Sequence, residues 1–428
     1  MAKSFMRIAL RVSALIFLAA SLRAQTPQAT VDRVANDPRL RAAEQFIRSD
    51  HDRIVREIIT LTEIPAPPFK ESARARAFMQ MLKAHGLTSV EIDAEGNALG
   101  LRKGVGNGPL IAIAAHLDTV FPEGTKIKVR KDGTRLLAPG IGDDTRGLAV
   151  LLGIIRALDS AKIQTTSDLL FVGDVGEEGA GDLRGMKYLF ERGPYKDRIK
   201  MFVSLDGAGD GSELTTGALG SKRYRVTYRG PGGHSYGSFG LVNPAYALAT
   251  AMTRLAAIPV SSNPRTTFNV GVIGGGTSVN AIPSEAWMDV DLRSESPERL
   301  DRLVETFVAQ MRSAADDENL ARSTAQGRID VETKLIGERP SGSTPLSSPI
   351  VQIATAVIQK FGMQAAHSIG STDANIPISL HIPAITIDSG GNGGRAHSLD
   401  EWIDVEKNAS AKGIHLVLTT IVCLAGLK

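Results

Sequence analysis

The sequence predicts an α/β protein in which one layered domain is interrupted by a smaller α+β domain. Short strands that are apolar throughout alternate with helical segments in the first half of the chain, as expected for a sheet covered on both faces. Near residue 217 the strands change to alternating polar and apolar residues, and after residue 340 the first pattern returns. The length of 428 residues is enough for two or three domains with separate cores.

The composition is that of an ordinary globular protein, with 43% hydrophobic and 22% charged residues. It excludes a disordered chain, a collagen-like chain and a polytopic membrane protein. A single cysteine, Cys423, excludes a disulfide scaffold, a cysteine-ligated zinc site and an iron–sulfur cluster. The net charge is +3, of which residues 1–24 contribute +4, so the rest of the chain carries −1. We therefore expect no nucleic-acid partner.

Residues 1–24 have the pattern of a signal peptide, in which three basic residues precede an apolar run over residues 12–22. The run is too short to cross a bilayer as a permanent helix, so we expect no stable membrane span. Cleavage after Ala24 would release a periplasmic or extracellular protein. An uncleaved anchor or an amphipathic helix is the alternative. We expect residues 1–35 to lie outside the fold.

The first helix is predicted over residues 38–63, where apolar residues recur at helical spacing before a proline-rich segment ends them. A second helix ends at Gly86, and the strands that follow are apolar runs. In all, we expect helices at residues 38–63, 72–86 and 145–159, and strands at residues 109–115, 168–173 and 201–205.

The middle of the chain predicts a ferredoxin-like unit, because its elements follow a β-α-β-β-α-β order. We expect strands at residues 222–229, 267–273, 286–292 and 329–336, and helices at residues 244–257 and 297–315. A linker at 340–348 then leads to a helix at 349–361, a strand at 383–388 and a final helix from about 404. The α/β domain therefore comprises residues 38–216 and 340–428, and the inserted domain residues 217–337.

Residues with metal-binding and acid–base chemistry follow nearly every apolar strand. His116 and Asp118 come after strand 109–115 and point the same way, because they are two residues apart in an extended chain. Open α/β sheets bind ligands at the carboxyl ends of their strands, so we expect these residues to converge. The others after such strands are Glu177 and Glu178, Asp206, and His397 in a glycine-rich loop, and a further pair, Asp143 and Asp144, lies in the loop before helix 145–159.

So many carboxylates would repel one another unless a cation lay among them. Two histidines and several carboxylates, with no cysteine, suit zinc, with manganese or cobalt as alternatives. The set is large enough for two ions if one carboxylate bridges them. The candidate ligands are His116, Asp143, Glu178, Asp206 and His397. Taken singly, each could equally be a helix cap or a hydrogen-bonded core residue.

The ordered motifs around His116, Asp143, Glu177, Asp206 and His397 resemble the co-catalytic zinc peptidases. That family includes glutamate carboxypeptidase, peptidase T, acetylornithine deacetylase, succinyl-diaminopimelate desuccinylase and the aminoacylases. The resemblance covers about residues 50–425. It implies a zinc-peptidase-like mixed sheet between helices, two Zn²⁺ ions, and an inserted domain that serves as a lid and dimerisation module.

The resemblance also implies roles for single residues. Asp143 would bridge the two ions, with His116 and Asp206 completing one ion and Glu178 and His397 the other. The family often has a cis peptide bond after the bridging residue, here between Asp143 and Asp144. Where the family often has lysine two residues after the bridge, this chain has Thr145 and then Arg146.

Catalytic and substrate-binding residues follow from the same resemblance. Glu177 would be the general base, and Asp118 would orient His116. His234, in a Gly-Gly-His segment of the inserted domain, would reach across a dimer and stabilise the oxyanion. Arg293, Asn280 and Thr372 match substrate-binding positions, and Arg293 could clamp a substrate carboxylate.

We therefore expect an exported, metal-dependent amide hydrolase, most simply a peptidase of short peptides that acts as a homodimer through the inserted domain. Whether it would be an aminopeptidase or a carboxypeptidase stays open. An N-acyl amino acid deacylase would use the same mechanism and is the main alternative. A catalytically inactive metal- or ligand-binding homologue is a further alternative, which the complete ligand set and the intact Glu177 argue against.

Overall fold

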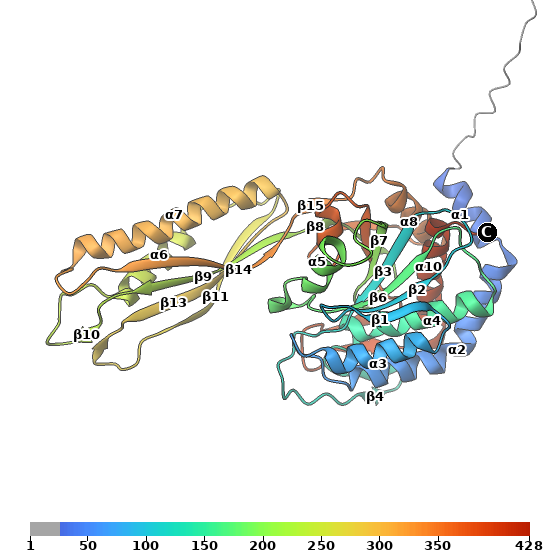
Figure 1. Ribbon diagram of the computed structural model, residues 1–428, viewed down its shortest axis with the longest axis horizontal. Helices are drawn as coiled ribbons and strands as arrows, with labels where there is room; N and C mark the ends of the chain where they lie inside the picture. The colour runs from blue at the N-terminus through green and yellow to red at the C-terminus, as the bar shows by residue number, and fades with distance from the viewer. Residues whose placement is uncertain (1–25) are drawn as a thin grey trace, which may run out of the picture.

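The computed structural model describes residues 26–428, which form a larger and a smaller body joined side by side (Figure 1). The predicted signal segment, residues 1–24, lies outside the described residues. The larger body contains both ends of the described chain, and the smaller one extends away from it (Figure 1). The chain passes from the larger to the smaller body after β8 (Glu213–Ala218) and returns before β15 (Gly342–Ser343).

A nine-stranded mixed sheet forms the centre of the larger body. Its order is β1-β2-β6-β3-β7-β17-β8-β15, with β16 also paired to β8. The four central strands are parallel and almost completely buried, which confirms the apolar runs as strands covered on both faces. The strands are β1 (Thr88–Ile92), β2 (Ala98–Arg102), β3 (Leu110–His116), β6 (Leu169–Asp174), β7 (Ile199–Leu205), β16 (Ala366–Gly370) and β17 (Ala384–Ile387).

Helices cover both faces of this sheet. One core cluster packs under α2 (Pro38–Thr62), α3 (Ser72–Lys83), α4 (Arg146–Ser160), α8 (Pro349–Lys360) and α10 (Lys407–Ala425). The other packs under α5 (Arg184–Glu191) and α9 (Asn375–Ser379). Helix α10 is long and apolar enough to span a membrane, but 78% of its apolar window is buried inside the protein. It is therefore a core helix of this domain.

The structure corrects the expectation that residues 1–35 lie outside the fold. Residues Pro27–Ala35 form helix α1, which packs against α8 and α10. Val31 and Val34 are fully buried, and Lys360 forms an ion pair with Asp32 at 2.8 Å. Two apolar residues three positions apart in one short helix are too weak a pattern to detect in sequence.

Several short elements of the larger body were not predicted. They include a small sheet of β4 (Arg130–Asp132), β5 (Arg135–Leu137), β18 (Asn392–Gly394) and β19 (Trp402–Asp404). Three-residue strands carry no periodicity of their own and form only because segments distant in sequence meet. This sheet joins the segment before Asp143 to the loop that contains His397, which matters for the site described below.

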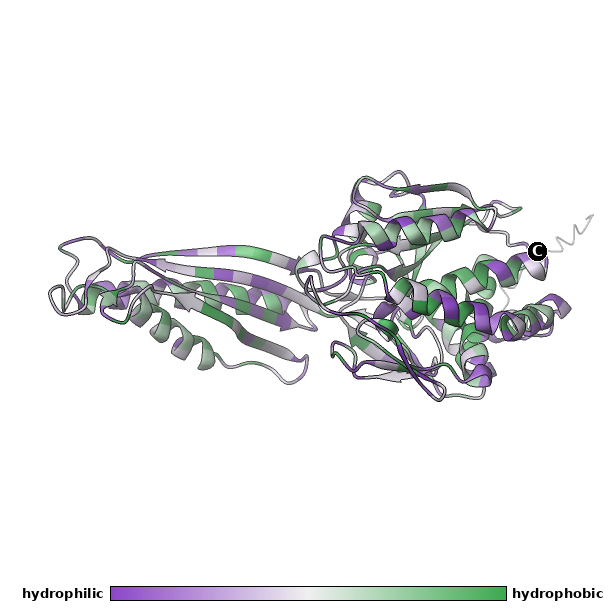
Figure 2. Cartoon of the chain, turned by 90° about the horizontal axis from the view of Figure 1, so that it is seen from below, coloured by the Kyte–Doolittle hydropathy of each residue, from purple (hydrophilic) through white to green (hydrophobic). Residues whose placement is uncertain are grey.

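The smaller body is a four-stranded antiparallel sheet of order β11-β13-β9-β14 with two helices on one face. The chain order is β9 (Gly220–Arg229), α6 (Pro244–Ala256), β11 (Thr266–Gly275), β13 (Glu285–Ser294), α7 (Pro297–Ala321) and β14 (Asp330–Arg339). This is the predicted β-α-β-β-α-β order with the first and third strands central, a ferredoxin-like arrangement. Hydrophobic and hydrophilic residues alternate along its strands, so one face packs on the helices and the other carries charged side chains (Figure 2).

Candidate active site

Three parallel strands deliver polar residues to one edge of the large sheet. Strand β3 ends at His116, which lies opposite Asp174 at the end of β6. Glu177 and Glu178 follow β6, and Asp206 follows β7. Because the carboxyl ends of neighbouring parallel strands meet at one edge, the predicted convergence is present in the structure.

The imidazoles and carboxylates of this edge lie in direct contact. The Nε2 atom of His116 is 2.7 Å from Oδ1 of Asp143, and Nε2 of His397 is 3.0 Å from Oδ2 of the same residue. His397 Nε2 is also 3.0 Å from Oε1 of Glu178. Each oxygen of Asp143 therefore contacts a different histidine, which is the arrangement required of a bridging carboxylate.

Two donor groups overlap at Asp143. One consists of His116, Asp143 and Asp206, and the other of Asp143, Glu178 and His397. A third group joins His116 to Glu177 and Glu178, so Glu177 lies within reach of the same centre. Within each group the possible ligand atoms lie within 4.8 Å of one another. Two imidazoles and three carboxylates without sulfur are a donor set for zinc or a similar divalent ion. The residues present fit a two-metal centre.

The electrostatics of the cluster also favour bound metal ions. Burial, and then the charge of Asp143, raise the pKa of Asp206 to about 7. Hydrogen bonds to Asp143 and Glu178 raise the pKa of His397 to about 10. The raised pKa values of Asp206 and His397 show that this part of the site favours bound protons, so it lacks positive charge that bound cations would provide.

The backbone around Asp143 is fixed by a residue that sequence reasoning missed. The peptide bond from Asp143 to Asp144 is cis, as the family resemblance implied. Buried Glu401 accepts hydrogen bonds from the backbone N–H groups of Gly142 at 2.6 Å and Asp143 at 2.9 Å. Burial raises the pKa of Glu401 to about 7. An acid in a polar loop gives no sequence signal of such a role.

Asp118 has a broader positioning role than predicted. Its carboxylate accepts hydrogen bonds from the backbone N–H groups of Glu177 at 3.0 Å and Glu178 at 2.9 Å. The Nδ1 atom of His116 lies 3.1 Å from the backbone oxygen of Asp118 and 3.6 Å from its Oδ1. Asp118 therefore orients His116 through its carbonyl oxygen and holds the Glu177–Glu178 backbone with its side chain.

Glu177, the predicted general base, is buried beside the donor groups and held by an arginine that the sequence did not single out. Arg339 Nη1 donates to Oε1 of Glu177 at 2.9 Å and to Oγ of Ser371 at 2.9 Å. Burial raises the pKa of Glu177 to about 8, against the opposing charge of Arg339. Arg339 lies at the end of β14, so the smaller body supplies this contact.

A cavity of about 390 Å³ opens over the donor groups. Its walls include Arg293, as predicted for a substrate-binding residue, and also Arg223, Arg339 and Ser371. Arg293 forms an ion pair with Asp291 at 2.6 Å. The cavity therefore combines carboxylates and imidazoles from the larger body with arginines from the smaller one.

Three predicted residues do not reach this cavity. The hydroxyl of Thr372 is 2.8 Å from that of Thr386, and its neighbour Ser371 lines the cavity instead. Asn280 and His234 lie together at the outer end of the smaller body, where Ser235 N–H donates to the Asn280 carbonyl oxygen. In Figure 1 the strand of His234, β10 (Gly233–His234), is at the end of the molecule away from the large sheet.

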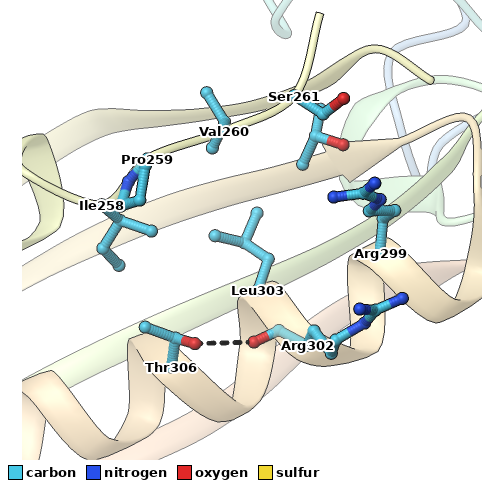
Figure 3. Close-up of a pocket in the computed structure, with 9 residues that line it drawn as sticks. Ile258, Pro259, Val260, Ser261, Arg299, Arg302, Leu303 and Thr306 are labelled. Carbon is cyan, nitrogen blue, oxygen red and sulfur yellow. Dashed lines mark hydrogen bonds between the residues drawn. The ribbon is translucent and has the colours of Figure 1, made fainter. Parts of the chain in front are cut away.

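A second cavity, of about 120 Å³, lies between residues 258–261 and α7 (Figure 3). Arg299, Arg302 and Leu303 line it from the helix, and Thr306 donates to the carbonyl oxygen of Arg302 at 2.9 Å. Its lining residues include no histidine, cysteine or carboxylate. This cavity offers neither metal ligands nor a general base, in contrast to the one over Asp143.

Comparisons with known proteins agree with this geometry. Residues 112–422 match the family model described as peptidase family M20/M25/M40. A succinyl-diaminopimelate desuccinylase from Corynebacterium glutamicum is 24% identical over 354 residues, which cover 81% of this chain and 90% of that protein. The uncharacterized protein YqjE of Bacillus subtilis is 25% identical over 379 residues, with 83% and 94% covered.

A solved structure shows the same fold. The aminopeptidase PepT from Bacillus cereus superposes with a TM-score of 0.69 at 24% identity, over 88% of this chain and 99% of that one. The likeness extends over both bodies, because the match covers most of this chain.

Proposed function

The chain belongs to peptidase family M20/M25/M40 and is a metal-dependent peptidase or amidohydrolase, and within that family we propose an exported, two-zinc peptidase of short peptides that works as a homodimer. One observation carries the proposal: two donor groups share Asp143, and Arg339 holds the carboxylate of Glu177 next to them. The donor chemistry favours zinc, since the ligands are imidazoles and carboxylates. Export rests on the basic and apolar pattern of residues 1–24.

His116, Asp143 and Asp206 would hold one ion, and Asp143, Glu178 and His397 the other. When bound, the ions would lower the pKa of a water molecule and polarise the substrate carbonyl. Glu177 accepts the proton of the attacking water at its carboxylate and passes it to the leaving nitrogen. Arg339 keeps that carboxylate in one orientation through both the side chain and the backbone of Glu177.

His234 is proposed to stabilise the oxyanion in a second copy of the chain. Its Nδ1 accepts hydrogen bonds from the N–H groups of Tyr236 and Gly237, both at 3.2 Å. The ring hydrogen is therefore on Nε2, which can donate to an oxyanion. Within one chain, His234 is exposed and remote from Asp143, so the proposed contact requires a partner.

The surroundings of His234 support a partner at this end of the molecule. Tyr236 is 89% exposed, Phe239 84% and Val279 fully exposed. Large apolar side chains clustered in this way usually mark a protein–protein contact. A homodimer would cover them and bring His234 and Asn280 to the partner's cavity.

The substrate class rests on Arg293, whose guanidinium lines the cavity and can bind a carboxylate. Short peptides and N-acyl amino acids both carry one. The desuccinylase among the relatives acts, by its name, on an acylated substrate, which keeps deacylation as the second candidate. Export favours peptide hydrolysis, because peptides are available outside the cytoplasm.

The test measures the release of free amino acids from dipeptides, tripeptides and N-acetyl amino acids by the purified protein, residues 25–428. The zinc-loaded protein is compared with protein from which a chelator has removed the metal. Metal-dependent release from the peptides is expected, and the order of release gives the end that is attacked. Cleavage of the N-acetyl amino acids alone would replace the peptidase by a deacylase. No turnover with zinc, cobalt or manganese would contradict both.

A further inference from the structure

The charged face of the small sheet ends in an unbalanced group of arginines at the cavity. In the strand register, Arg293 and Arg339 both lie opposite Ser221, on either side of it. Two residues further along β9, Arg223 lies opposite Asp291. These side chains share one face, because residues two apart in a strand point the same way. All three arginines line the cavity over the donor groups.

Further from the cavity, the positive and negative charges on the same face are balanced. Arg225 pairs with Asp289 at 2.7 Å, and Arg229 pairs with Glu285 at 3.0 Å and Glu332 at 2.9 Å. Each guanidinium there has at least one carboxylate of its own.

At the cavity this balance is lost. Arg223 and Arg293 share the carboxylate of Asp291, at 3.5 Å and 2.6 Å respectively. Arg339 is already engaged by Glu177. The pair Arg223 and Arg293 therefore carries one positive charge more than its carboxylate neutralises.

Burial and neighbouring positive charges both disfavour the charged form of Arg223. Burial, and then the charges of Arg339 and Arg293, lower the pKa of Arg223 despite the opposing carboxylates of Asp291 and Asp182. Asp182 is itself paired with Lys187, at 2.6 Å. Arg223 is held in place by a hydrogen bond from Nη1 to the carbonyl oxygen of Gly179, next to Glu178. An anion bound between these guanidiniums would relieve the repulsion and complete their hydrogen bonds.

We propose that Arg223 is a specificity-determining residue that binds a second anionic group of the substrate, so that the preferred substrate is a dicarboxylate. Diagonal neighbours in antiparallel strands, as Arg223 and Arg293 are, have Cα atoms about 7–8 Å apart. Arginine side chains carried on Cα atoms at that spacing can bind two carboxylates separated by a few carbon atoms. The class that fits is an amide whose residue beside the scissile bond is acidic, such as glutamate or aspartate. For the reaction, this inference rests on the proposed function.

The anion site can be tested without turnover. Calorimetric titration of the zinc-loaded protein, residues 25–428, would compare glutarate with butyrate, which differ by one carboxylate. Glutarate is expected to bind at least tenfold more tightly, and Arg223→Gln is expected to abolish that difference. The matched control is Arg225→Gln, on the same face of the same strand but outside the cavity, which should retain it. Equal binding of the two acids, or equal effects of the two variants, would overturn the proposal.

Turnover separates this inference from the proposed function. The values of kcat/KM for Ala-Glu and Ala-Gln, and for N-acetylglutamate and N-acetylglutamine, would be compared. A preference of at least tenfold for the acidic substrate is expected, and Arg223→Gln is expected to remove that preference. Hydrolysis without that preference would contradict the dicarboxylate and leave the proposed function intact. If no substrate is hydrolysed but glutarate binding still depends on Arg223, the proposed function is contradicted and the dicarboxylate site is kept.

Discussion

Acidic and basic residues meet in two regions of this protein, and the two regions use them differently. On the open face of the small sheet, partly exposed arginines each pair with carboxylates across neighbouring strands. At the carboxyl edge of the large sheet, carboxylates crowd around two histidines, and Arg339 contacts Glu177. Charge is balanced locally in the first region and unbalanced in the second.

The difference indicates which charges serve stability and which serve function. Exposed ion pairs contribute little to stability and are screened by salt. The ion pairs of Arg225 and Arg229 on the small sheet, here called the ladder, therefore mainly keep that face soluble and the strands in register. Buried carboxylates cost stability unless a cation neutralises them, and proteins retain such clusters chiefly at functional sites. The predictions below compare substitutions in the two regions.

The largest difference is expected between Glu177→Ala and Glu332→Ala. Loss of the proposed general base should lower kcat roughly 10²- to 10⁴-fold, because proton transfer to the leaving nitrogen would lose its catalyst. Glu332 only pairs with exposed Arg229, so its removal should leave kcat unchanged. Steady-state kinetics would be measured on samples whose zinc content is verified. Wild-type turnover by metal-replete Glu177→Ala would disprove the assignment.

The next largest effect concerns His234, which lies in the smaller body but is proposed to act on the partner's cavity. His234→Ala should lower kcat about 10²- to 10³-fold, as loss of an oxyanion donor does, while the protein still elutes as a dimer. Mixing it with Glu177→Ala should restore part of the activity, because each mixed dimer then contains one complete site. A monomeric active enzyme, or no recovery on mixing, would exclude action across a dimer.

A smaller effect is expected from Asp388, a partly buried acid directly after β17. Burial raises its pKa to about 6, against an ordinary value of 3.8. The unfolded chain therefore ionises first, so this group reduces stability as pH rises from about 4 to 6, by up to about 3 kcal/mol above that range. Asp388→Asn should raise the free energy of unfolding at pH 8 and have little effect at pH 4. Denaturant titration at both pH values would check this, and an equal effect at both would contradict it.

The smallest effect is expected from Arg225→Gln in the ladder. Its partner Asp289 is accessible to water, so the loss should be less than about 1 kcal/mol and should shrink further at high salt. Thermal unfolding at low and high ionic strength would measure it. A loss of several kcal/mol that is insensitive to salt would mean that the ladder, and not the helices behind it, determines the stability of the small sheet.

Much of this molecule could be predicted because its main signals are local. A run of apolar residues predicts a buried strand. Metal ligands such as His116 and Asp206 lie at or directly after a strand end, so one segment of sequence predicts both the strand and its ligand. The β-α-β-β-α-β order likewise follows from consecutive patterns. Short strands such as β4 and β19, and helix α1, were missed because they depend on packing partners rather than on their own sequence.

The sequence by itself therefore determined the order of elements, the two sheet types and the set of candidate ligands. Only the tertiary structure decided which carboxylate each imidazole contacts, and it alone revealed Glu401 beneath Asp143, Arg339 on Glu177 and Arg223 over the cavity. The physical reason is distance along the chain. Glu401 and Asp143 are 258 positions apart and Arg339 and Glu177 are 162 apart, so no local periodicity can encode these contacts. They arise when separately predictable elements pack.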